Sequence, residues 1–437
     1  MNKFSIILII TSIALMGCPG TTMETTESPS YSDQKELIPN DHTYEASIQS
    51  VQLYQAGVEE SYPVLFLNTT SPLTLEFDEL IPENQRESDF TVEFVNCDAD
   101  WNPTNVLPIE FFEGFAQQRI ENFERSSFTK VPYVHYRYQF PRENEFFKIS
   151  GNYLLIAYRN NNRNDLILSR RFIVVERKLG ITPKYLLNDR VERIRMSEFS
   201  FDLSIGGMNI YNPANDLYIK VLQNFRWDNY MVLREPRFAR DKQFEYYIDL
   251  AKGFRGGNEY RRLDIRSTRF YAEGIQDVEE KEDIYEIFLY KDDIRKQNIY
   301  LPRRDRNGSY RIGVQEWPNA DLNADYVSTN FFLDSPEPIP DGEVYVFGRF
   351  SDWQLRSKNK MTYNDDLRRY EGTVILKQGV YDYAYGVEKN GDFLVDESVF
   401  EGPHFESENF YTILVYYRAP GDRTDRLVGY QPVNYYE

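Results

Sequence analysis

The sequence predicts an all-β protein made of consecutive β-sandwich domains of the immunoglobulin-like or E-set-like kind. Short segments alternate between outward and inward positions, as in Tyr381, Tyr383 and Tyr385, and a period of two is the period of a strand with one buried face. Such segments recur at a spacing of roughly ten residues, which is typical of sandwiches. Tyr and Phe dominate an aromatic content of 16%, and aromatic residues favour strands over helices.

The expected strands follow one another along the whole chain. In the first part they are expected at 47–55, 62–68, 73–80, 90–95, 133–141, 149–160 and 166–176. In the rest they are expected at 199–205, 217–222, 244–250, 262–271, 284–290, 310–314, 327–333, 344–350, 372–376, 381–387 and 410–417. Only two short helices are expected, near 109–114 and near 214–218.

Glycine and proline residues indicate where one domain ends and the next begins. The length of 437 residues suggests about three domains, and the positions of the glycine- and proline-rich segments support four. The first break is expected at 179–183, the second at the glycine-rich 253–257, and the clearest at 336–340, where three prolines make a stiff linker. The expected domains are 44–177, 178–258, 259–335 and 336–437.

The first 18 residues have the pattern of a lipoprotein signal. Lys3 gives a short basic start, an apolar core follows, and Leu-Met-Gly-Cys ends the segment, so Cys18 is expected to carry the acyl chains. The apolar core has about a dozen residues, against about 20 needed to span a bilayer. Residues 19–43 are rich in Thr, Ser, Glu and Pro, and a disordered tether is expected there.

Cys97 is the only other cysteine, so acylation of Cys18 would exclude an intramolecular disulfide. It ends an apolar segment with no Lys or Arg beside it in the sequence. A buried, unreactive thiol is therefore expected.

The charge and the motifs exclude several classes of function. Removal of Lys3 with the signal takes the formal charge from −19 to −20, and such an acidic surface repels nucleic acid. Residues 127–130 match Ser-x-x-Lys, but the other motifs of penicillin-recognising enzymes are absent from the sequence. A serine-hydrolase elbow, a phosphate-binding loop and a dinucleotide fingerprint are absent too, so no catalytic residue is assigned and an enzyme is not expected.

Two segments, 98–102 and 321–325, carry acidic or amide residues at alternate positions, as a calcium loop does at its start. The first then has Pro103 where the loop needs glycine and Ile109 where it needs a bidentate acid, and the second fails in the same way. The acids of the first segment are instead expected to accept backbone N–H bonds in a turn, with Trp101 closing over the sandwich edge.

The three histidines, His42, His135 and His404, lie far apart in the sequence with no neighbouring Cys or His at ligand spacing. A histidine-rich zinc site is therefore not expected. No metal or cofactor is assigned.

Residues 92–115 read VEFVNCDADWNPTNVLPIEFFEGF, a buried strand that runs into an aromatic and acidic loop. With the surrounding strands in this order, residues 44–177 resemble the first domain of the plug protein of the type IX secretion system. The matching residues are Cys97, Asp100, Trp101, Gly114, Phe115, Ser150, Gly151 and Asn152. Asn96 departs from the pattern, because the family often has His there.

The resemblance implies a non-catalytic subunit that docks on the periplasmic side of the outer-membrane translocon barrel and seals it when no cargo is engaged. The implied partners are the barrel and, through the lipid on Cys18, the inner leaflet of the outer membrane. The implied location is the periplasm.

The last expected domain carries a second pattern. Gly348, Phe350 and Trp353 match the G-x-F-x-x-W of glycogen-binding carbohydrate modules, in which an exposed Trp stacks on sugar rings. The same three residues serve the fold, with Gly348 in a tight turn and the two aromatic rings at the sandwich end, and the last domain of plug proteins has a similar pattern. The structural role is preferred, and the alternative function is a lipid-anchored glycan-binding protein that uses Trp353.

Overall fold

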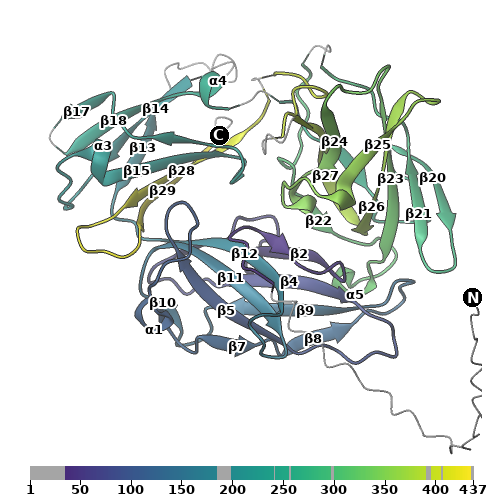
Figure 1. The fold of residues 1–437 in the computed structure, drawn as a ribbon, viewed down its shortest axis with the longest axis horizontal. Coiled ribbons are helices and arrows are strands. Elements are labelled where there is room, and N and C mark those ends of the chain that lie inside the picture. The colour runs from purple at the N-terminus through teal and green to yellow at the C-terminus, as the bar shows by residue number, and fades with distance from the viewer. Residues whose placement is uncertain are drawn as a thin grey trace, which may run out of the picture. The chain divides into compact units, whose positions relative to one another are not determined.

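The structure is a computed structural model, and it is drawn in Figure 1. It describes residues 35–184, 198–240, 242–254, 257–296, 300–389, 395–404 and 407–434. All of these belong to one unit, Lys35–Glu437. Cys18, the expected lipidation residue, and most of the expected tether lie outside the described residues.

Two sheets form the first sandwich. One sheet has the order β1 (His42–Thr43), β12 (Leu166–Val175), β11 (Gly151–Arg159), β5 (Phe90–Cys97) and β7 (Gln117–Arg119), with β3 (Val64–Phe66) parallel to β12. The other has the order β2 (Ile48–Gln55), β4 (Leu73–Leu80), β9 (Tyr133–Phe140) and β8 (Asn122–Arg125). A helical turn, α1 (Pro108–Phe111), leads into a small ribbon of β6 (Phe112–Glu113) and β10 (Phe146–Phe147). The ends of the seven strands expected in this part lie within three residues of their expected positions, and β8 is an additional strand.

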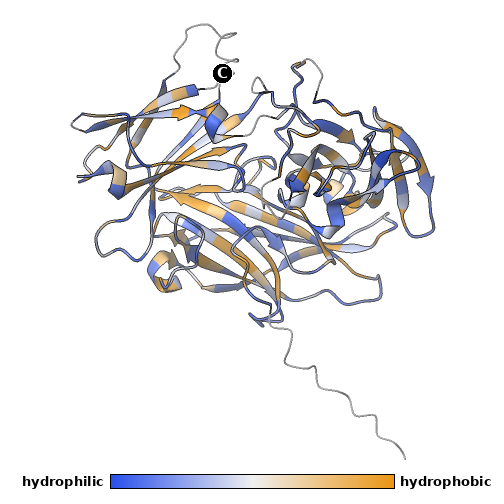
Figure 2. Ribbon diagram, turned by 45° about the horizontal axis from the view of Figure 1, so that its top comes forward, coloured by the Kyte–Doolittle hydropathy of each residue, from blue (hydrophilic) through white to orange (hydrophobic). Residues whose placement is uncertain are grey.

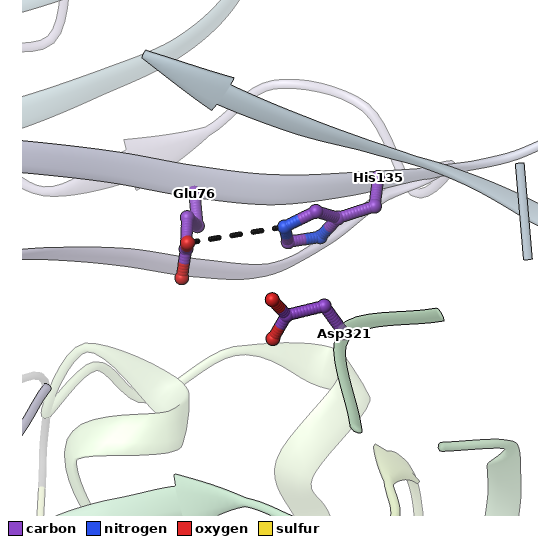
Figure 3. Close-up of side chains that lie close together, drawn as sticks. All are labelled: Glu76, His135 and Asp321. Carbon is purple, nitrogen blue, oxygen red and sulfur yellow. Dashed lines mark ion pairs between the residues drawn. The ribbon is translucent and has the colours of Figure 1, made fainter. Parts of the chain in front are cut away.

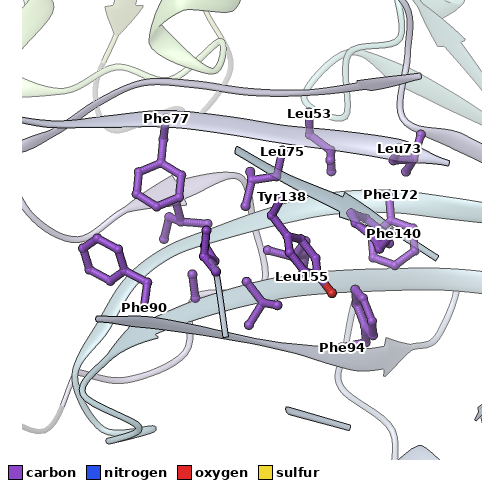
Figure 4. Packing of buried hydrophobic residues seen from close by; sticks show 14 of the residues in the cluster. Leu53, Leu73, Leu75, Phe77, Phe90, Phe94, Tyr138, Phe140, Leu155 and Phe172 are labelled. Carbon is purple, nitrogen blue, oxygen red and sulfur yellow. The ribbon is translucent and has the colours of Figure 1, made fainter. Parts of the chain in front are cut away.

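The core between these sheets is aromatic. Phe77 of β4 stacks on Tyr136 of β9 with ring centroids 5.1 Å apart, and Phe94 of β5 meets Phe140 of β9 at 4.9 Å. Figure 4 shows Phe77, Phe94 and Phe140 with neighbouring leucines between the layers. Full burial of each such side chain contributes about 1.5–3 kcal/mol, so this core is the main source of stability for the sandwich.

Residues 35–43 correct the expectation of a disordered tether over 19–43. β1 pairs with the edge of β12, and the Lys35 ammonium lies 2.6 Å from carboxylate oxygens of both Glu45 and Asp165. The Ser169 hydroxyl also donates to the carbonyl of Asn40 at 2.7 Å. The composition of this segment does not indicate that it is ordered, because its contacts are hydrogen bonds and ion pairs rather than apolar burial.

The second sandwich combines two distant parts of the chain. One sheet has the order β13 (Gly180–Lys184), β14 (Glu198–Ser204), β18 (Gln243–Asp249) and β17 (Phe238–Arg240). The other has the order β16 (Tyr230–Leu233), β15 (Leu217–Gln223), β28 (Phe410–Tyr417) and β29 (Arg426–Asn434). The turns α3 (Pro213–Asp216) and α4 (Leu250–Gly253) connect strands. The C-terminal strands β28 and β29 therefore belong with residues 178–254.

The third part is a strongly interleaved sheet. Among the described residues it contains nine strands in the order β19 (Arg261–Asp264), β27 (Gly379–Lys389), β24 (Gly342–Phe347), β25 (Lys360–Asn364), β26 (Arg369–Lys377), β23 (Tyr326–Asp334), β21 (Tyr285–Leu289) and β20 (Ile275–Glu280), with β22 (Tyr310–Ile312) beside β27. The short helices α5 (Ala320–Asn323), η1 (Arg349–Ser351) and η2 (Ser357–Asn359) lie in its connections. We call this part the nine-stranded sheet.

The sheets group the chain differently from the expected boundary at 335/336. Strand β23 pairs with β26 over nine residue pairs, from Tyr326–Lys377 to Asp334–Arg369, across the proline-rich segment 336–340. The segments 259–335 and 336–389 therefore share one sheet, and 410–434 pairs elsewhere. A proline-rich connection does not by itself indicate a domain boundary. Strands on its two sides can belong to the same sheet, as β23 and β26 do.

The predicted fold class is confirmed, since 49% of the described residues are in strands and 6% are in helices. Figure 2 shows apolar and polar residues alternating along the strands. Both expected helices exist as single turns, α1 and α3. None of the helices in the described residues has the length and apolar character needed to cross a bilayer.

Candidate functional site

The loop after β5 is a tight turn organised by Asp98. One oxygen of its carboxylate accepts the backbone N–H groups of Asp100 and Asn102, each at 2.9 Å. Trp101 has a φ of +69° in this turn and its indole is buried. Asp98 therefore has the role expected from the turn hypothesis, and its carboxylate is engaged by the loop itself rather than aimed at a shared cation.

Asp100 has a different role from the one expected, because it contacts the second sandwich. Its carboxylate accepts a hydrogen bond from the Tyr218 hydroxyl at 2.8 Å and lies 2.9 Å from the ammonium of Lys220, which is only 1% exposed. Partial desolvation would raise the pKa of Asp100, but the hydrogen bonds from Lys220 and Tyr218 outweigh it and lower that pKa. Asp100 thus compensates a buried charge of strand β15.

Trp101 and Cys97 also face inward. The Arg171 guanidinium lies 4.7 Å from the Trp101 ring centroid, and the ring of Trp227 meets the indole edge-on at 4.7 Å. Cys97 is fully buried, and burial followed by the charge of Asp98 raises the pKa of its thiol to about 12. These residues are scaffold at the contact between the two sandwiches, and their side chains are not available to an outside partner.

Gly151 occupies a position that excludes a side chain. Its φ is +143°, and a Cβ atom there would lie 2.8 Å from the backbone carbonyl oxygen of Asp425 in the β28–β29 connection. The carboxylate of Asp425 in turn accepts the backbone N–H of Ala99 at 2.8 Å. The glycine therefore allows the first sandwich to approach the second closely.

Gly114 and Phe115 lie on the outside of the first sandwich. Gly114 has a φ of +142°, and a Cβ there would come within 2.7 Å of the Phe112 ring, so the chain reversal needs glycine. Phe115 follows with 81% of its side chain exposed. Of the two matched aromatic residues, Trp101 is buried and Phe115 is presented to solvent.

Three further apolar side chains surround the same ribbon. Leu107 is 60% exposed, Ile109 75% and Phe146 50%. Phe146 of β10 pairs with Glu113 of β6. Directly after β10, the Lys148 ammonium donates a hydrogen bond to the carbonyl of Ile109 in α1 at 2.6 Å. We call Leu107, Ile109, Phe115 and Phe146 the apolar end. Four large exposed apolar side chains around one ribbon are typical of an interaction surface rather than of scattered surface residues.

Trp353 is partly buried and packs inside the protein. The Arg226 guanidinium lies 4.4 Å from its ring centroid, and the ring lies so close to Gly308 that a Cβ on that glycine would clash with it. Trp353 borders a cavity of about 430 Å³ whose arginines bind protein groups, as Arg349 does with the carbonyl of Ser61 at 3.0 Å.

Phe350 packs against the core of the nine-stranded sheet, and Gly348 is needed because a Cβ would lie 2.7 Å from the carbonyl oxygen of Asp382. Its φ of 173° is ordinary extended backbone, so close approach rather than a tight turn explains the glycine.

A buried polar joint connects the first sandwich to the nine-stranded sheet. The Lys377 ammonium lies 2.7 Å from the Asp78 carboxylate, with both side chains at most 2% exposed. The Tyr326 hydroxyl donates to the same carboxylate at 2.6 Å, and the Asp325 carboxylate accepts the backbone N–H of Lys130 at 2.7 Å. The second calcium-like segment, 321–325, is thus part of this joint.

Glu76, His135 and Asp321 meet at the edge of the joint, as Figure 3 shows. Glu76 comes from β4, His135 from β9 and Asp321 from α5, and one potential ligand atom from each lies within 4.8 Å of the other two. Sequence spacing does not indicate this group, because 59 and 186 positions separate its members along the chain.

The fold is that of an all-β protein with two sandwiches and a large interleaved sheet, and its exposed apolar end is a feature of an interaction protein. Residues 48–176 match the family model described as the type 9 secretion system plug protein 1st domain. This match confirms the resemblance to a plug-type first domain that was expected from residues 44–177. Residues outside 48–176 are not part of that match.

A search of curated proteins gives no match. Among solved structures, the chain is similar to a hypothetical protein from Parabacteroides merdae, with a TM-score of 0.82 and 29% identity over 91% of this chain and 100% of that one. The native form of E. coli alpha-2-macroglobulin (TM-score 0.18, 9% identity, 91% of this chain and 23% of that one) and the collagen adhesin of S. aureus (0.11, 8%, 87% and 91%) are too dissimilar to support an argument. The arrangement of all three parts therefore recurs in a crystal structure.

Proposed function

We propose that this protein is a plug subunit that docks on the periplasmic side of the type IX translocon barrel and seals it when no cargo is engaged. The observation that carries the proposal is the plug-type first domain at residues 48–176, which bears the apolar end on its surface. A secretion barrel wide enough for folded cargo leaks solutes when both ends are open. A rigid β protein that covers one mouth prevents this without any chemistry.

The apolar end is the proposed contact with the barrel. Phe115 and Phe146 are the kind of aromatic side chains that are enriched in interfaces, and they project from a ribbon rather than from a long mobile loop. A stable complex needs to bury at least about 1,000 Å² in total, so these side chains would form the centre of a larger surface. Gly114 supports the contact indirectly, because it fixes the reversal that exposes Phe115.

The anchor and the charge fit the same location. We propose that Cys18 carries acyl chains in the inner leaflet of the outer membrane, with the segment up to residue 34 as the link to the first sandwich. The formal charge of −20 that remains after removal of Lys3 with the signal keeps the undocked protein soluble in the periplasm and away from nucleic acid. We assign no catalytic role, because the buried acids described above are engaged in ion pairs and backbone hydrogen bonds within the joint.

Glycan binding through Trp353 receives no support as a second function. A sugar-stacking tryptophan presents a free ring face, whereas Trp353 packs beside Arg226 and Gly308. A glycan array with the full chain and a Trp353→Ala variant tests this directly. Binding that is present in the wild type and lost in the variant would revive the glycan interpretation.

The docking surface is tested by replacing Phe115 with Ser and measuring co-purification with the barrel. Loss of a buried aromatic anchor costs about 2 kcal/mol or more, which corresponds to roughly a 30-fold weaker complex. The matched control is Phe270→Ser, because Phe270 is 72% exposed but lies between β19 and β20, two strands of the nine-stranded sheet. Equal recovery of the barrel with both variants would contradict the assignment of the apolar end, while absence of the barrel even from the wild-type preparation would contradict docking itself.

A further inference from the structure

Glu76, His135 and Asp321 bring one imidazole nitrogen and two carboxylates together from three different elements. His135 Nε2 lies 3.9 Å from Glu76 Oε1, as the dashed line in Figure 3 shows. The atoms of the three groups lie within 4.8 Å of one another, whereas ligands around a tetrahedral zinc ion lie about 3.4 Å apart. Side-chain movements of little more than 1 Å would therefore close the group around one ion.

The imidazole of His135 is oriented for this role. Its Nδ1 lies 2.8 Å from the Asp78 carboxylate, and because that carboxylate is held ionised by Lys377, Nδ1 is the donor. With the proton on Nδ1, the lone pair of an uncharged imidazole lies on Nε2. This atom is buried and has no hydrogen-bond partner among the described residues. A carboxylate that fixes one ring nitrogen while the other faces the ion is the usual support of a metal-binding histidine.

The two carboxylates are also positioned by neighbours. The Tyr54 hydroxyl donates to Glu76 Oε2 at 2.5 Å, which leaves Oε1 directed toward His135. The Arg137 guanidinium donates to Glu76 Oε1, and it donates to Asp321 Oδ2 at 2.8 Å. Arg137 therefore supplies the positive charge between the two acids, and its side chain, 40% exposed, has room to move toward solvent.

We propose that Glu76, His135 and Asp321 form a site for a divalent first-row transition-metal ion such as Zn²⁺, which replaces the Arg137 guanidinium between the two carboxylates. One imidazole with two carboxylates suits such an ion better than Ca²⁺, which prefers six to eight oxygen ligands. The bound ion would join β4 and β9 of the first sandwich to α5 of the nine-stranded sheet. The proposal concerns a site that the plug function does not require, and it stands independently of that function.

The test is a titration of the purified full chain with Zn²⁺ by isothermal calorimetry, with Co²⁺ absorption as a second measurement of nitrogen and oxygen coordination. The wild type is expected to bind one ion per chain. Asp321→Asn keeps the shape of a partly exposed side chain and is expected to weaken binding at least about tenfold, a loss typical of disturbed metal sites. His135→Phe is expected to abolish the Co²⁺ absorption bands.

Arg137→Gln separates the metal site from a purely structural ion-pair network. Removal of the competing guanidinium is expected to strengthen Zn²⁺ binding several-fold, although it removes two hydrogen bonds from the joint. Glu279→Gln, a change at an exposed acid on β20, is the control for nonspecific attraction by the acidic surface and is expected to leave the affinity unchanged.

The outcomes decide the proposal even where one variant fails to fold. Absence of saturable one-to-one binding by the wild type would overturn it. Equal affinity of wild type and Asp321→Asn would do the same, because the ion would then be bound elsewhere. Circular dichroism and an unchanged unfolding midpoint in chelator verify that Asp321→Asn remains folded, so this variant decides the question if His135→Phe does not fold.

Discussion

Replacement of Lys377 by Met is expected to destabilise the protein strongly, because it leaves the buried Asp78 carboxylate without its cation. The two charged groups are 2.7 Å apart, and at an effective dielectric constant of about 20 this corresponds to an attraction of about 6 kcal/mol. The hydrogen bonds from Tyr326 and His135 remain and satisfy part of the carboxylate. We therefore expect a loss of about 3–5 kcal/mol, the range for removal of one partner of a buried pair.

Urea denaturation followed by tryptophan fluorescence measures this loss at pH 7. The double variant Asp78→Asn/Lys377→Met is expected to lose less than the sum of the two single losses, because it leaves no unpaired charge. A loss below about 1 kcal/mol in Lys377→Met, or additive losses in the cycle, would refute the claim that this pair holds the joint together.

The same pair makes stability depend on pH. Burial would raise the pKa of Asp78, but Lys377 and His135 outweigh it and lower that pKa. A carboxyl with a lowered pKa in the folded state stabilises the protein above its unfolded pKa of about 3.9, and this contribution is lost as the pH falls through the folded value. The wild type is expected to lose its advantage over Lys377→Met below about pH 4, whereas an advantage that stays constant down to pH 2 would contradict the assignment.

Three further changes test other parts of the account. Gly151→Ala is expected to lower the free energy of unfolding by more than Gly57→Ala. Both glycines have positive φ angles, where backbone strain costs about 1–3 kcal/mol, but only at Gly151 would the added Cβ meet a backbone carbonyl. Equal losses in urea titrations would argue against the close approach. Cys97 is expected to react with a thiol reagent at pH 8 only after denaturation, because burial raises the pKa of the thiol to about 12, and labelling of the folded chain would contradict its burial. Labelled palmitate is expected in the wild type and not in Cys18→Ser, and label retained in the variant would rule out acylation at this cysteine.

The strand positions were the part of the structure that the sequence predicted best. Strand β4 lies at Leu73–Leu80, where it was expected. The prediction succeeds because the alternating apolar residues of this segment are buried in one core. The segment expected as a strand at 262–271 continues only to Asp264, and β24 ends at Phe347 where a 3-10 turn follows. Strand β29 was missed, because Gly429 and Pro432 weaken its pattern while its pairing with β28 supplies the stability.

The pairing of distant strands and the joint could not be predicted. Residues such as Lys377 and Asp78 are buried only because the nine-stranded sheet meets the first sandwich, and a charged residue in a single sequence is expected on the surface. Gly114 and Phe115 were identified from the family resemblance, but only the structure separates Phe115, which is exposed, from Trp101, which is internal. Local pattern therefore predicts elements and core positions, and it does not predict contacts between elements that fold separately.

The proposal that this protein seals the translocon is tested most directly by deleting its gene and measuring the uptake of a large antibiotic or dye that the outer membrane normally excludes. An unplugged barrel is expected to admit the compound, and expression of the wild-type chain is expected to restore exclusion. Normal exclusion in the deletion strain, with the barrel still present in the outer membrane, would contradict the plug function.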